Sequence, residues 1–429
     1  MNAARRHPRS LEEVVSSALC TGCGLCASLD PARVDMTVTA QGRMRPRIEC
    51  RSDKDGVLAL DVCPGVHVDG STVRDRLAPG APADRVWGHA ARLAHGYATD
   101  AEVRYRGATA GVLSALSLYL LDEGLVDGVL HVEADAERPL LSTPRVSKDR
   151  EGVLSGASSR YGPAAPLVQV VQLLDAGRRF AVVGKPCDVA AVRNLGRHDP
   201  RVRVQIPYLL TMICEGVPDF DSTAGIVEGF GVREDEVAEI SYRGLGWPGP
   251  TRVVTRDGRV FEKTYIETWR GTVPYNLQFR CKICPDSVGL QADIVVGDAW
   301  LSGEPRAELR DGWSCVIART SRGEELLARA EREGRLFLEP LTFDQLDEMQ
   351  PQHVRRRESI VPRLAGMLAA GAGLPRFRHL GLWDLMFHSS PRNSWRNFVG
   401  TARRVHAGQT REELVRPGAP CARSTGGER

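Results

Sequence analysis

The sequence has little net charge and no long apolar run. The formal net charge of its 429 residues is +3, which is too small to indicate a nucleic-acid partner. No segment approaches the ~18 consecutive apolar residues that a membrane-spanning helix needs. The arginine-rich start is followed by no apolar signal core, so we expect a cytoplasmic protein. The sequence also contains no Walker A motif and no internal repeat.

Cysteine, by contrast, is present in an informative pattern. The 11 cysteines are grouped, which is typical of metal ligation in a reducing compartment. Cys20, Cys23 and Cys26 form a C-x-x-C-x-x-C motif, the spacing of a [4Fe–4S] ligand set. Gly22 and Gly24 between them permit the tight turns that such a set needs. This part of the chain is therefore predicted to bind an iron–sulfur cluster.

The fourth ligand of this set is predicted from a Cys-Pro pair. In ferredoxin-type runs a cysteine that precedes proline supplies the last thiolate. Cys63-Pro64 is the pair nearby, so we assign Cys63, with Cys50 as the alternative. Zinc also binds paired cysteines and remains the competing interpretation.

A second group of four cysteines comprises Cys187, Cys214, Cys281 and Cys284. The first two follow buried strands that we expect over residues 179–184 and 204–212, and α/β folds place their chemistry at such strand ends. The other two form a C-x-x-C-P motif. We interpret the group as a second [4Fe–4S] site, because two neighbouring clusters would conduct electrons. Zinc and a redox dithiol are the alternatives.

Strands and helices alternate from residue 86 onward. The pattern predicts a strand at 91–98, a helix at 112–123 and a strand at 125–132. Such alternation is typical of α/β folds. We expect an α/β protein with mixed sheets and a small N-terminal ferredoxin-like cluster module.

Two small, polar loops are candidate cofactor contacts. The first contains Gly107, Thr109 and Gly111; the second contains Ser158, Arg160 and Tyr161. The first would present the amides of a helix N-terminus to a phosphate, although it lacks the G-x-G-x-x-G spacing. In the second, the arginine suits a phosphate and the tyrosine a ring face. Plain close packing and an ordinary surface loop are the respective alternatives.

Asp298 and His131 are the candidate proton donors. Asp298 lies at the end of a strand expected within residues 292–300, close to the second cysteine group. There it would orient a cofactor or donate a proton, with helix capping as the simpler role. The sequence assigns no catalytic acid.

These motifs occur in a fixed order between residues 15 and 340. The series is Cys20-x-x-Cys-Gly-x-Cys, the loop before Val112, Ser158-x-Arg160-Tyr161, Gly184-Lys185-Pro186-Cys187, Cys214-Glu215-Gly216 and Cys281-x-x-Cys284-Pro285. It resembles the beta subunits of coenzyme F420 hydrogenases and dehydrogenases, a superfamily that includes 7-hydroxymethyl chlorophyll a reductase. The stretch after about residue 345 resembles nothing that we can name.

The resemblance implies an FAD held in the α/β region beside a [4Fe–4S] cluster. It makes the two polar loops flavin contacts and places Lys185 near the flavin or the cluster. We expect four parts: a ferredoxin-like cluster module and linker (1–84), an N-terminal flavin-binding region (85–175), a C-terminal region with the second cluster (176–345) and a helical tail with a disordered end (346–429). The resemblance implies the two middle parts, and composition predicts the linker and the disordered end.

The expected function is that of an iron–sulfur flavoprotein oxidoreductase. Electrons would pass from ferredoxin or a partner subunit through two [4Fe–4S] clusters to FAD, and then to an organic acceptor such as a deazaflavin coenzyme or a tetrapyrrole. An electron-transfer subunit without a substrate of its own is the alternative, and a zinc-stabilised binding module is the third. The aromatic and arginine-rich stretch 383–398 would dock a partner, lie on a membrane surface or pack against the main domain.

Overall fold

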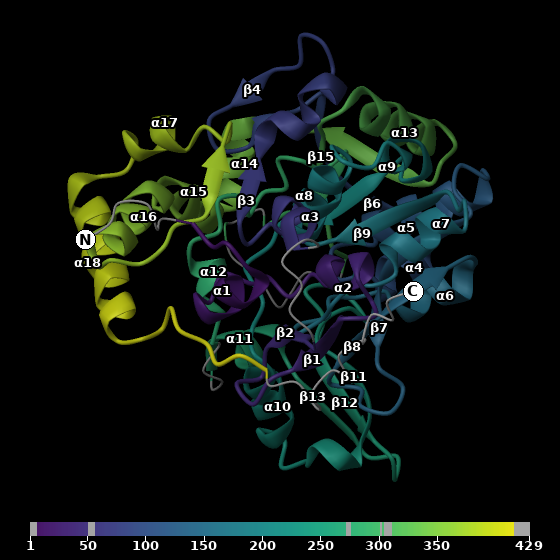
Figure 1. The fold of residues 1–429 in the computed structure, drawn as a ribbon. Coiled ribbons are helices and arrows are strands. Elements are labelled where there is room, and N and C mark those ends of the chain that lie inside the picture. The colour runs from purple at the N-terminus through teal and green to yellow at the C-terminus, as the bar shows by residue number, and fades with distance from the viewer. Residues whose placement is uncertain (1–6, 50–55, 272–275, 301–302, 304–310, 416–429) are drawn as a thin grey trace, which may run out of the picture.

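A computed structural model describes residues 7–49, 56–271, 276–300, 303 and 311–415 (Figure 1). At its centre lies an eight-stranded mixed sheet in the order β16-β6-β15-β14-β10-β9-β7-β8. The parallel inner strands are β14 (Ile294–Asp298), β10 (Leu209–Met212), β9 (Phe180–Gly184) and β7 (Gly128–Ala134). The antiparallel flanking strands are β15 (Ser314–Ala318), β6 (Arg92–Ala98), β16 (Leu336–Pro340) and β8 (Ser142–Ser147).

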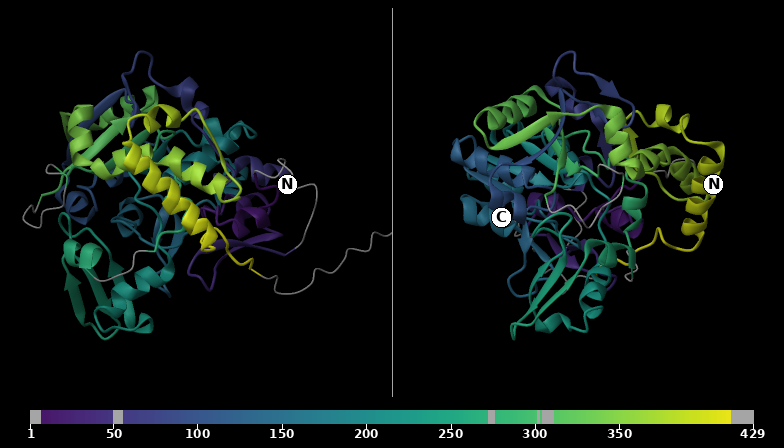
Figure 2. Two further views of the ribbon diagram at one scale, coloured as in Figure 1. Left: turned by 90° about the vertical axis from the view of Figure 1, so that its left-hand side faces the viewer. Right: turned by 180° about the vertical axis from the view of Figure 1, so that it is seen from behind.

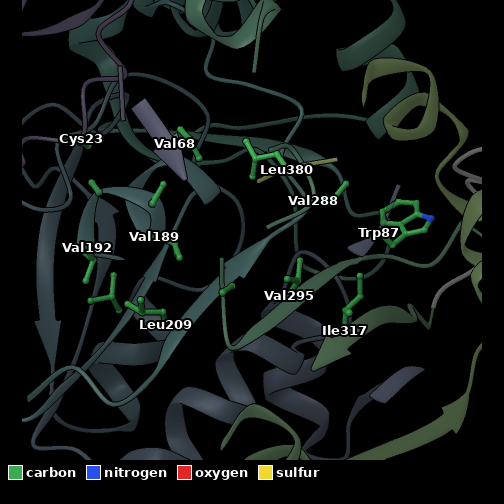
Figure 3. Close-up of a cluster of buried hydrophobic side chains, with 14 of the residues drawn as sticks. Cys23, Val68, Trp87, Val189, Val192, Leu209, Val288, Val295, Ile317 and Leu380 are labelled. Carbon is green, nitrogen blue, oxygen red and sulfur yellow. The ribbon is translucent and has the colours of Figure 1, made fainter. Parts of the chain in front are cut away.

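Helices cover both faces of this sheet. Alternation along each strand divides its side chains between two cores. Val296 and Val316 pack in the core of α5 (Val112–Asp122) and α13 (Ser321–Arg332). Val295 and Ile317 pack in the core of α8 (Pro186–Leu195), which Figure 3 shows. Burial on both faces explains the nearly continuous apolar sequence of the inner strands.

The N-terminal module is small and packs against the C-terminal helices. It contains α1 (Leu11–Ser16), α2 (Leu25–Leu29), the hairpin β1 (Val34–Val38) and β2 (Met44–Ile48), and α3 (Gly56–Val62). Strand β3 (His67–Asp69) then pairs in parallel with β17 (Arg376–Arg378). The C-terminal helices are α14 (Phe343–Met349), α15 (Pro351–Glu358), α16 (Ile360–Ala369), α17 (Leu382–Met386) and α18 (Pro391–His406). Helix α18 packs along α16 (Figure 2).

A three-stranded antiparallel sheet forms a separate lobe at the bottom of Figure 1. Its strands are β11 (Val237–Ser241), β12 (Thr251–Thr255) and β13 (Val260–Lys263), flanked by α10 (Phe220–Glu228), η2 (Glu234–Glu236) and α11 (Tyr265–Gly271). Val227, Ile240 and Val253 share its core. The shorter remaining elements are η1 (Gly70–Arg76), β4 (Ala83–Asp84), β5 (Gly88–His89), α4 (Ala101–Arg106), α6 (Arg150–Ser155), α7 (Val170–Asp175), α9 (Arg201–Gln205) and α12 (Phe279–Lys282).

The predicted fold class is confirmed, and one strand prediction is wrong. The strand expected over residues 204–212 begins only at Leu209, because α9 occupies residues 201–205. Pro200 caps this helix, and Asp199 accepts a hydrogen bond from the amide of Arg201 at 3.0 Å. Such a start favours helix over strand. No helix in the described ranges is long and apolar enough to cross a membrane. The four predicted domain boundaries stay predictions.

Candidate functional site: a cofactor cavity beside two groups of thiols

A cavity of about 520 Å³ lies at the carboxyl ends of β9, β10 and β14. Open α/β sheets place ligands at this edge, and the volume lies within the usual range for ligand pockets. All predicted cofactor contacts line it, namely Gly107, Thr109, Gly111, Ser158, Arg160, Tyr161, Lys185 and Asp298. The fold thus gathers residues that are up to about 190 positions apart in the sequence around one space. Their individual roles stay predictions.

The loop 107–111 forms a tight cradle at the start of α5. Gly111 has φ +75° and caps the helix, and a Cβ there would lie 2.4 Å from the carbonyl oxygen of Val103. Leu113 and Ser114, in the first turn of α5, also line the cavity. Because first-turn amides have no acceptor within their own helix, this end of α5 suits an anionic group.

Arg160 and Tyr161 are held by protein groups on the far wall. The guanidinium of Arg160 donates to the carbonyls of Ile240 (3.1 Å) and Leu141 (2.8 Å), among others. The Tyr161 ring lies 4.4 Å from that of Trp269, centroid to centroid. Arg160 therefore joins the small sheet to the β7–β8 hairpin. A bound phosphate could use only those N–H groups of Arg160 that do not already donate to carbonyls.

Asp298 forms a buried ion pair with Arg243. Arg243 donates to both carboxylate oxygens at 2.7 and 2.8 Å, and Trp247 Nε1 donates at 3.0 Å. Burial opposes the charged form of Arg243, but Asp298 raises the pKa of Arg243 well above its usual value. Another Arg243 bond reaches the carbonyl of Ala108 at 2.9 Å, in the cradle. Asp298 thus positions Arg243 and the loop.

Two residues next to the second thiol group supply charge to the cavity. Lys185 Nζ lies 2.8 Å from Asp188 Oδ2. Burial lowers the pKa of Lys185, but the charges of Asp188 and Cys187 raise it above its usual value. Asp188 Oδ1 is buried and accepts no hydrogen bond from any described residue. A donor on a bound cofactor would satisfy that oxygen.

His131, the second candidate proton donor, lines the same cavity. Both ring nitrogens already have partners, the carbonyl of Val132 at 3.1 Å and Ser147 Oγ at 2.7 Å. Burial lowers the pKa of His131 below its usual value. The geometry favours a neutral, structural histidine.

The four cysteines of the predicted second group come from separate elements, and their role as cluster ligands stays a prediction. Cys187 lies in the first turn of α8, Cys214 follows β10, and Cys281 lies in α12 close to Cys284. Burial and the neighbouring charges of Cys281 and Cys284 raise the pKa of Cys214 to about 12. Cys214 also lines the cofactor cavity, so the group lies directly beside that space.

The first thiol group surrounds a small apolar pocket in the N-terminal module. Cys20, Cys23, Cys26 and Cys63 all line this pocket. Burial, and after it the charge of Cys20, raises the pKa of the Cys63 thiol to about 12. Gly22 and Gly24 adopt φ +77° and +84°, as the tight turn demands. Cys50, the alternative fourth ligand, lies outside the described residues.

Gln278 joins the two thiol groups. Its Nε2 lies 3.4 Å from Cys281 Sγ in the second group and 3.5 Å from the carbonyl of Thr21 in the first. Its Oε1 accepts from the buried Arg45 at 3.2 Å. The thiols of Cys20 and Cys281 both raise the pKa of Arg45, although burial alone would lower it. One amide and one guanidinium thus lie between the groups.

The C-terminal helices contribute residues that the sequence analysis missed. His353 on α15 lies 3.0 Å from Glu215, and Arg356 donates to the carbonyl of Cys281 at 2.7 Å. Burial opposes ionisation, but His353 and Arg356 lower the pKa of Glu215 to about 2. Arg243 was missed as well, although the run 242–250 around it is rich in glycine, proline and aromatic residues.

The binding of iron–sulfur clusters and of a flavin by this chain stays a prediction. Buried and half-buried thiols with cationic neighbours, as in these two groups, are the type of ligand that iron–sulfur clusters use. No group of three or more His, Cys, Asp or Glu side chains within the described ranges is placed to hold a metal ion. Cys315 is buried on β15 and lines neither site. Cys421 lies outside the described residues.

Family models for the coenzyme F420 hydrogenase/dehydrogenase beta subunit match two adjacent parts of the chain. The N-terminal model matches residues 93–172 and the C-terminal model residues 177–343. The chain belongs to this family. The resemblance seen in the motifs is therefore confirmed, and membership gives the chain an oxidoreductase role.

Three curated proteins illustrate the similarity of this chain to known sequences. The coenzyme F420 hydrogenase subunit beta of Methanococcus voltae is 29% identical over 62% of this chain and 94% of its own length. The F420-dependent formate dehydrogenase 1 subunit beta of Methanococcus maripaludis is 26% identical over 55% of this chain and 58% of its own. The coenzyme F420-dependent sulfite reductase of Methanocaldococcus jannaschii is 24% identical over 82% of this chain and 52% of its own.

A solved structure shares the fold. A chain of the F420-reducing [NiFe] hydrogenase complex from Methanosarcina barkeri superposes with a TM-score of 0.52 at 24% identity. The match covers 66% of this chain and 95% of that one. This likeness supports the mixed α/β architecture described above.

Proposed function

We propose that the chain is an iron–sulfur flavoprotein that carries electrons between a redox partner and an organic acceptor. The observation that carries the proposal is the position of Cys214, which belongs to the second thiol group and also lines the cavity of all predicted cofactor contacts. A cluster on that group and a flavin in that cavity would be neighbours. The first thiol group, linked through Gln278, would extend the path toward the protein surface.

The residues of the chain would have distinct tasks. Cys20, Cys23, Cys26 and Cys63 would hold one [4Fe–4S] cluster, and Cys187, Cys214, Cys281 and Cys284 the other. FAD, when bound, would couple one-electron to two-electron chemistry. The amides at the start of α5 would bind its phosphates, while Lys185 would supply positive charge near the second thiol group. Arg243, fixed by Asp298, would hold the cradle loop in place.

Ferredoxin or a partner subunit would exchange electrons at the first thiol group. The acceptor would be a deazaflavin coenzyme, as the names of the relatives suggest, or a tetrapyrrole-like molecule. Among the described residues that line the cavity, each carboxylate is in an ion pair, namely those of Asp188, Glu215 and Asp298. The proton for such an acceptor would therefore come from solvent or from the acceptor's own groups.

The test is a visible spectrum of protein purified without oxygen, with iron, sulfide and flavin assayed on the same sample. The proposal expects about eight irons, four for each [4Fe–4S] cluster, and one FAD per chain. Cys63→Ser and Cys214→Ser should each remove about half of the iron. Cys315→Ser is the matched control and should remove none. A colourless protein with stoichiometric zinc would contradict the proposal.

A non-catalytic electron-transfer subunit is the second candidate. It is favoured by the relatives that are named as subunits and by three exposed aromatic residues near the C-terminal end. Trp383, Phe387 and Trp395 are 71%, 77% and 66% exposed. Reduction of a soluble acceptor by the isolated chain would favour the first candidate. Co-purification with a larger subunit, and loss of it in Trp395→Ala, would favour the second.

A further inference from the structure

A second cavity lies at the opposite edge of the parallel strands from the cofactor cavity. Its volume is about 560 Å³. Leu209 at the start of β10 lines it, whereas Met212 at the end of β10 lines the cofactor cavity. Helix α8 connects the two spaces, since Lys185 precedes the helix at one end and Arg193 lies near its other end. The two cavities are therefore separate sites.

Arginine dominates the wall of this cavity, which we call the arginine pocket. The five that line it are Arg74, Arg76, Arg193, Arg197 and Arg203. Carboxylates pair with three of them: Asp293 with Arg193 at 3.1 Å, Asp69 with Arg197 at 3.5 Å and Asp75 with Arg203 at 3.0 Å. Arg74 and Arg76 pair with no carboxylate among the described residues. The pocket thus has an excess of positive charge.

Of the two arginines without a carboxylate partner among the described residues, Arg76 is the less exposed, so water screens its charge less. The residue is half-buried in the wall, whereas Arg74 is exposed at the rim. Burial and the charge of Arg193 lower the pKa of Arg76, and Arg322 adds to this repulsion while Asp293 opposes it. An anion between these guanidinium groups would remove that cost.

One part of the remaining wall is apolar. Val202, Ile206 and Leu209 are buried side chains that line the pocket beside the arginines. A ligand that fits would have a strongly anionic end and a less polar body. Guanidinium groups bind phosphate oxygens through paired hydrogen bonds, and several arginines match more than one phosphate group.

We propose that the arginine pocket binds a small molecule that carries a diphosphate or longer phosphate chain. The site is independent of the thiol groups and of the cofactor cavity, so its test does not depend on the function proposed above. Because α8 runs from this pocket to Cys187, an occupant would contact the same helix that presents a ligand of the second thiol group.

The test is isothermal titration calorimetry of the full chain at low salt with pyrophosphate, ADP and sulfate. Pyrophosphate should bind at one site and more tightly than sulfate at equal ionic strength. Arg76→Gln and Arg74→Gln should each weaken it about tenfold or more, since each removes a charge-assisted contact. Arg332→Gln, an exposed arginine on α13 outside the pocket, is the control and should change nothing.

Comparison of the phosphate probes identifies the ligand class. Tighter binding of ADP than of pyrophosphate would indicate a nucleotide, and the reverse would indicate another phosphorylated molecule. Pyrophosphate that binds no better than sulfate, or equally to Arg76→Gln and wild type, would overturn the proposal. If Arg76→Gln fails to fold, the exposed Arg74 carries the same test.

Discussion

Buried charges in this chain are matched by partners at short range, and this governs what single substitutions will do. Arg319 donates to the carbonyls of Gly289, Val288 and His89, and Arg357 to that of Leu380. Where the partner is an oppositely charged side chain, removing one member of the pair leaves the other charged and desolvated, which costs far more than an exposed pair contributes. Substitution of a residue in a buried ion pair at the cofactor cavity should therefore lower the stability of the protein as well as its affinity for the cofactor.

Asp298→Ala should lower the free energy of unfolding by about 3–5 kcal/mol, because Arg243 would remain buried without its counter-charge. The side chains of this pair are 3% and 14% exposed. Urea denaturation followed by circular dichroism measures the change. Asp235→Ala is the control, since Asp235 and its partner Arg233 are both 73% exposed and its stability should stay close to that of the wild type. Equal effects of the two substitutions would contradict the structural role assigned to Asp298.

If the second thiol group holds a cluster as proposed, Gln278→Leu should lower its midpoint potential by about 20–60 mV. Hydrogen bonds to cluster sulfurs raise the potential, a bond of this kind contributes about 0.5–1.5 kcal/mol, and 59 mV corresponds to a tenfold change for one electron. Redox titration monitored by electron paramagnetic resonance measures it. Gln172→Leu, on the exposed side of α7, should leave both potentials unchanged. An unaltered potential in Gln278→Leu would show that the contact with Cys281 has no electronic effect.

The N-terminal ends of α5 and α8, with the loops before them, form part of the wall of the cofactor cavity. Helix α5 begins at a glycine in the left-handed region, and α8 begins at Lys185 with proline in the next position. Both starts lie at the cofactor cavity, while the bodies of the helices cover opposite faces of the sheet. The apolar faces of the helices fix the positions at which their N-terminal amides are presented.

Gly111→Ala should reduce the flavin content of the purified protein. The new Cβ would meet the carbonyl of Val103 at 2.4 Å, and the φ of +75° adds about 1 kcal/mol of strain, so the cradle loop must move. Gly124→Ala is matched in conformation, with φ +58° and nothing within 4 Å, and should keep its flavin. Absorbance at the flavin band per mole of protein is the measurement. Equal flavin content in both variants would show that the loop does not bind the cofactor.

The N-terminal module contacts the C-terminal region of the chain at more than one place. Strand β3 pairs with β17, and Glu412 reaches back to Arg45, 367 positions away, with a 2.8 Å hydrogen bond. The C-terminal helices also supply the charged neighbours of the second thiol group. The region after residue 345 is thus part of the structure around both predicted clusters.

Glu412→Gln should destabilise the N-terminal module and lower its iron content. Arg45 is 1% exposed, and Glu412 is its only carboxylate partner among the described residues. Loss of this partner should lower the free energy of unfolding by about 3 kcal/mol. Urea denaturation and iron analysis report the two effects. Glu413→Gln, its exposed neighbour, is the control and should behave as wild type. An unchanged iron content in Glu412→Gln would show that the contact between Glu412 and Arg45 is not needed for iron binding by the first thiol group.

Sequence alone could predict those parts of the protein that depend on the local spacing of residue types. The cysteine motifs, the inner strands and the cradle loop each depend on residues within a few positions of one another, where periodicity and turn geometry are decisive. The strand start at Leu209 escaped prediction because the helix start at Pro200 competes with an apolar pattern over the same residues. The family motifs predicted the order of these parts along the chain, but they did not predict which residues contact one another.

Tertiary structure alone decided which distant residues meet. Arg243 with Asp298, Gln278 between the thiol groups, His353 beside Glu215 and Arg45 with Glu412 are joined by the packing of separate elements. A single charged or polar side chain carries no signal of its partner, because its energy depends on the burial and geometry that the completed fold imposes. The arginine pocket arises in the same way, from arginines on separate elements that the fold brings to one edge of the sheet.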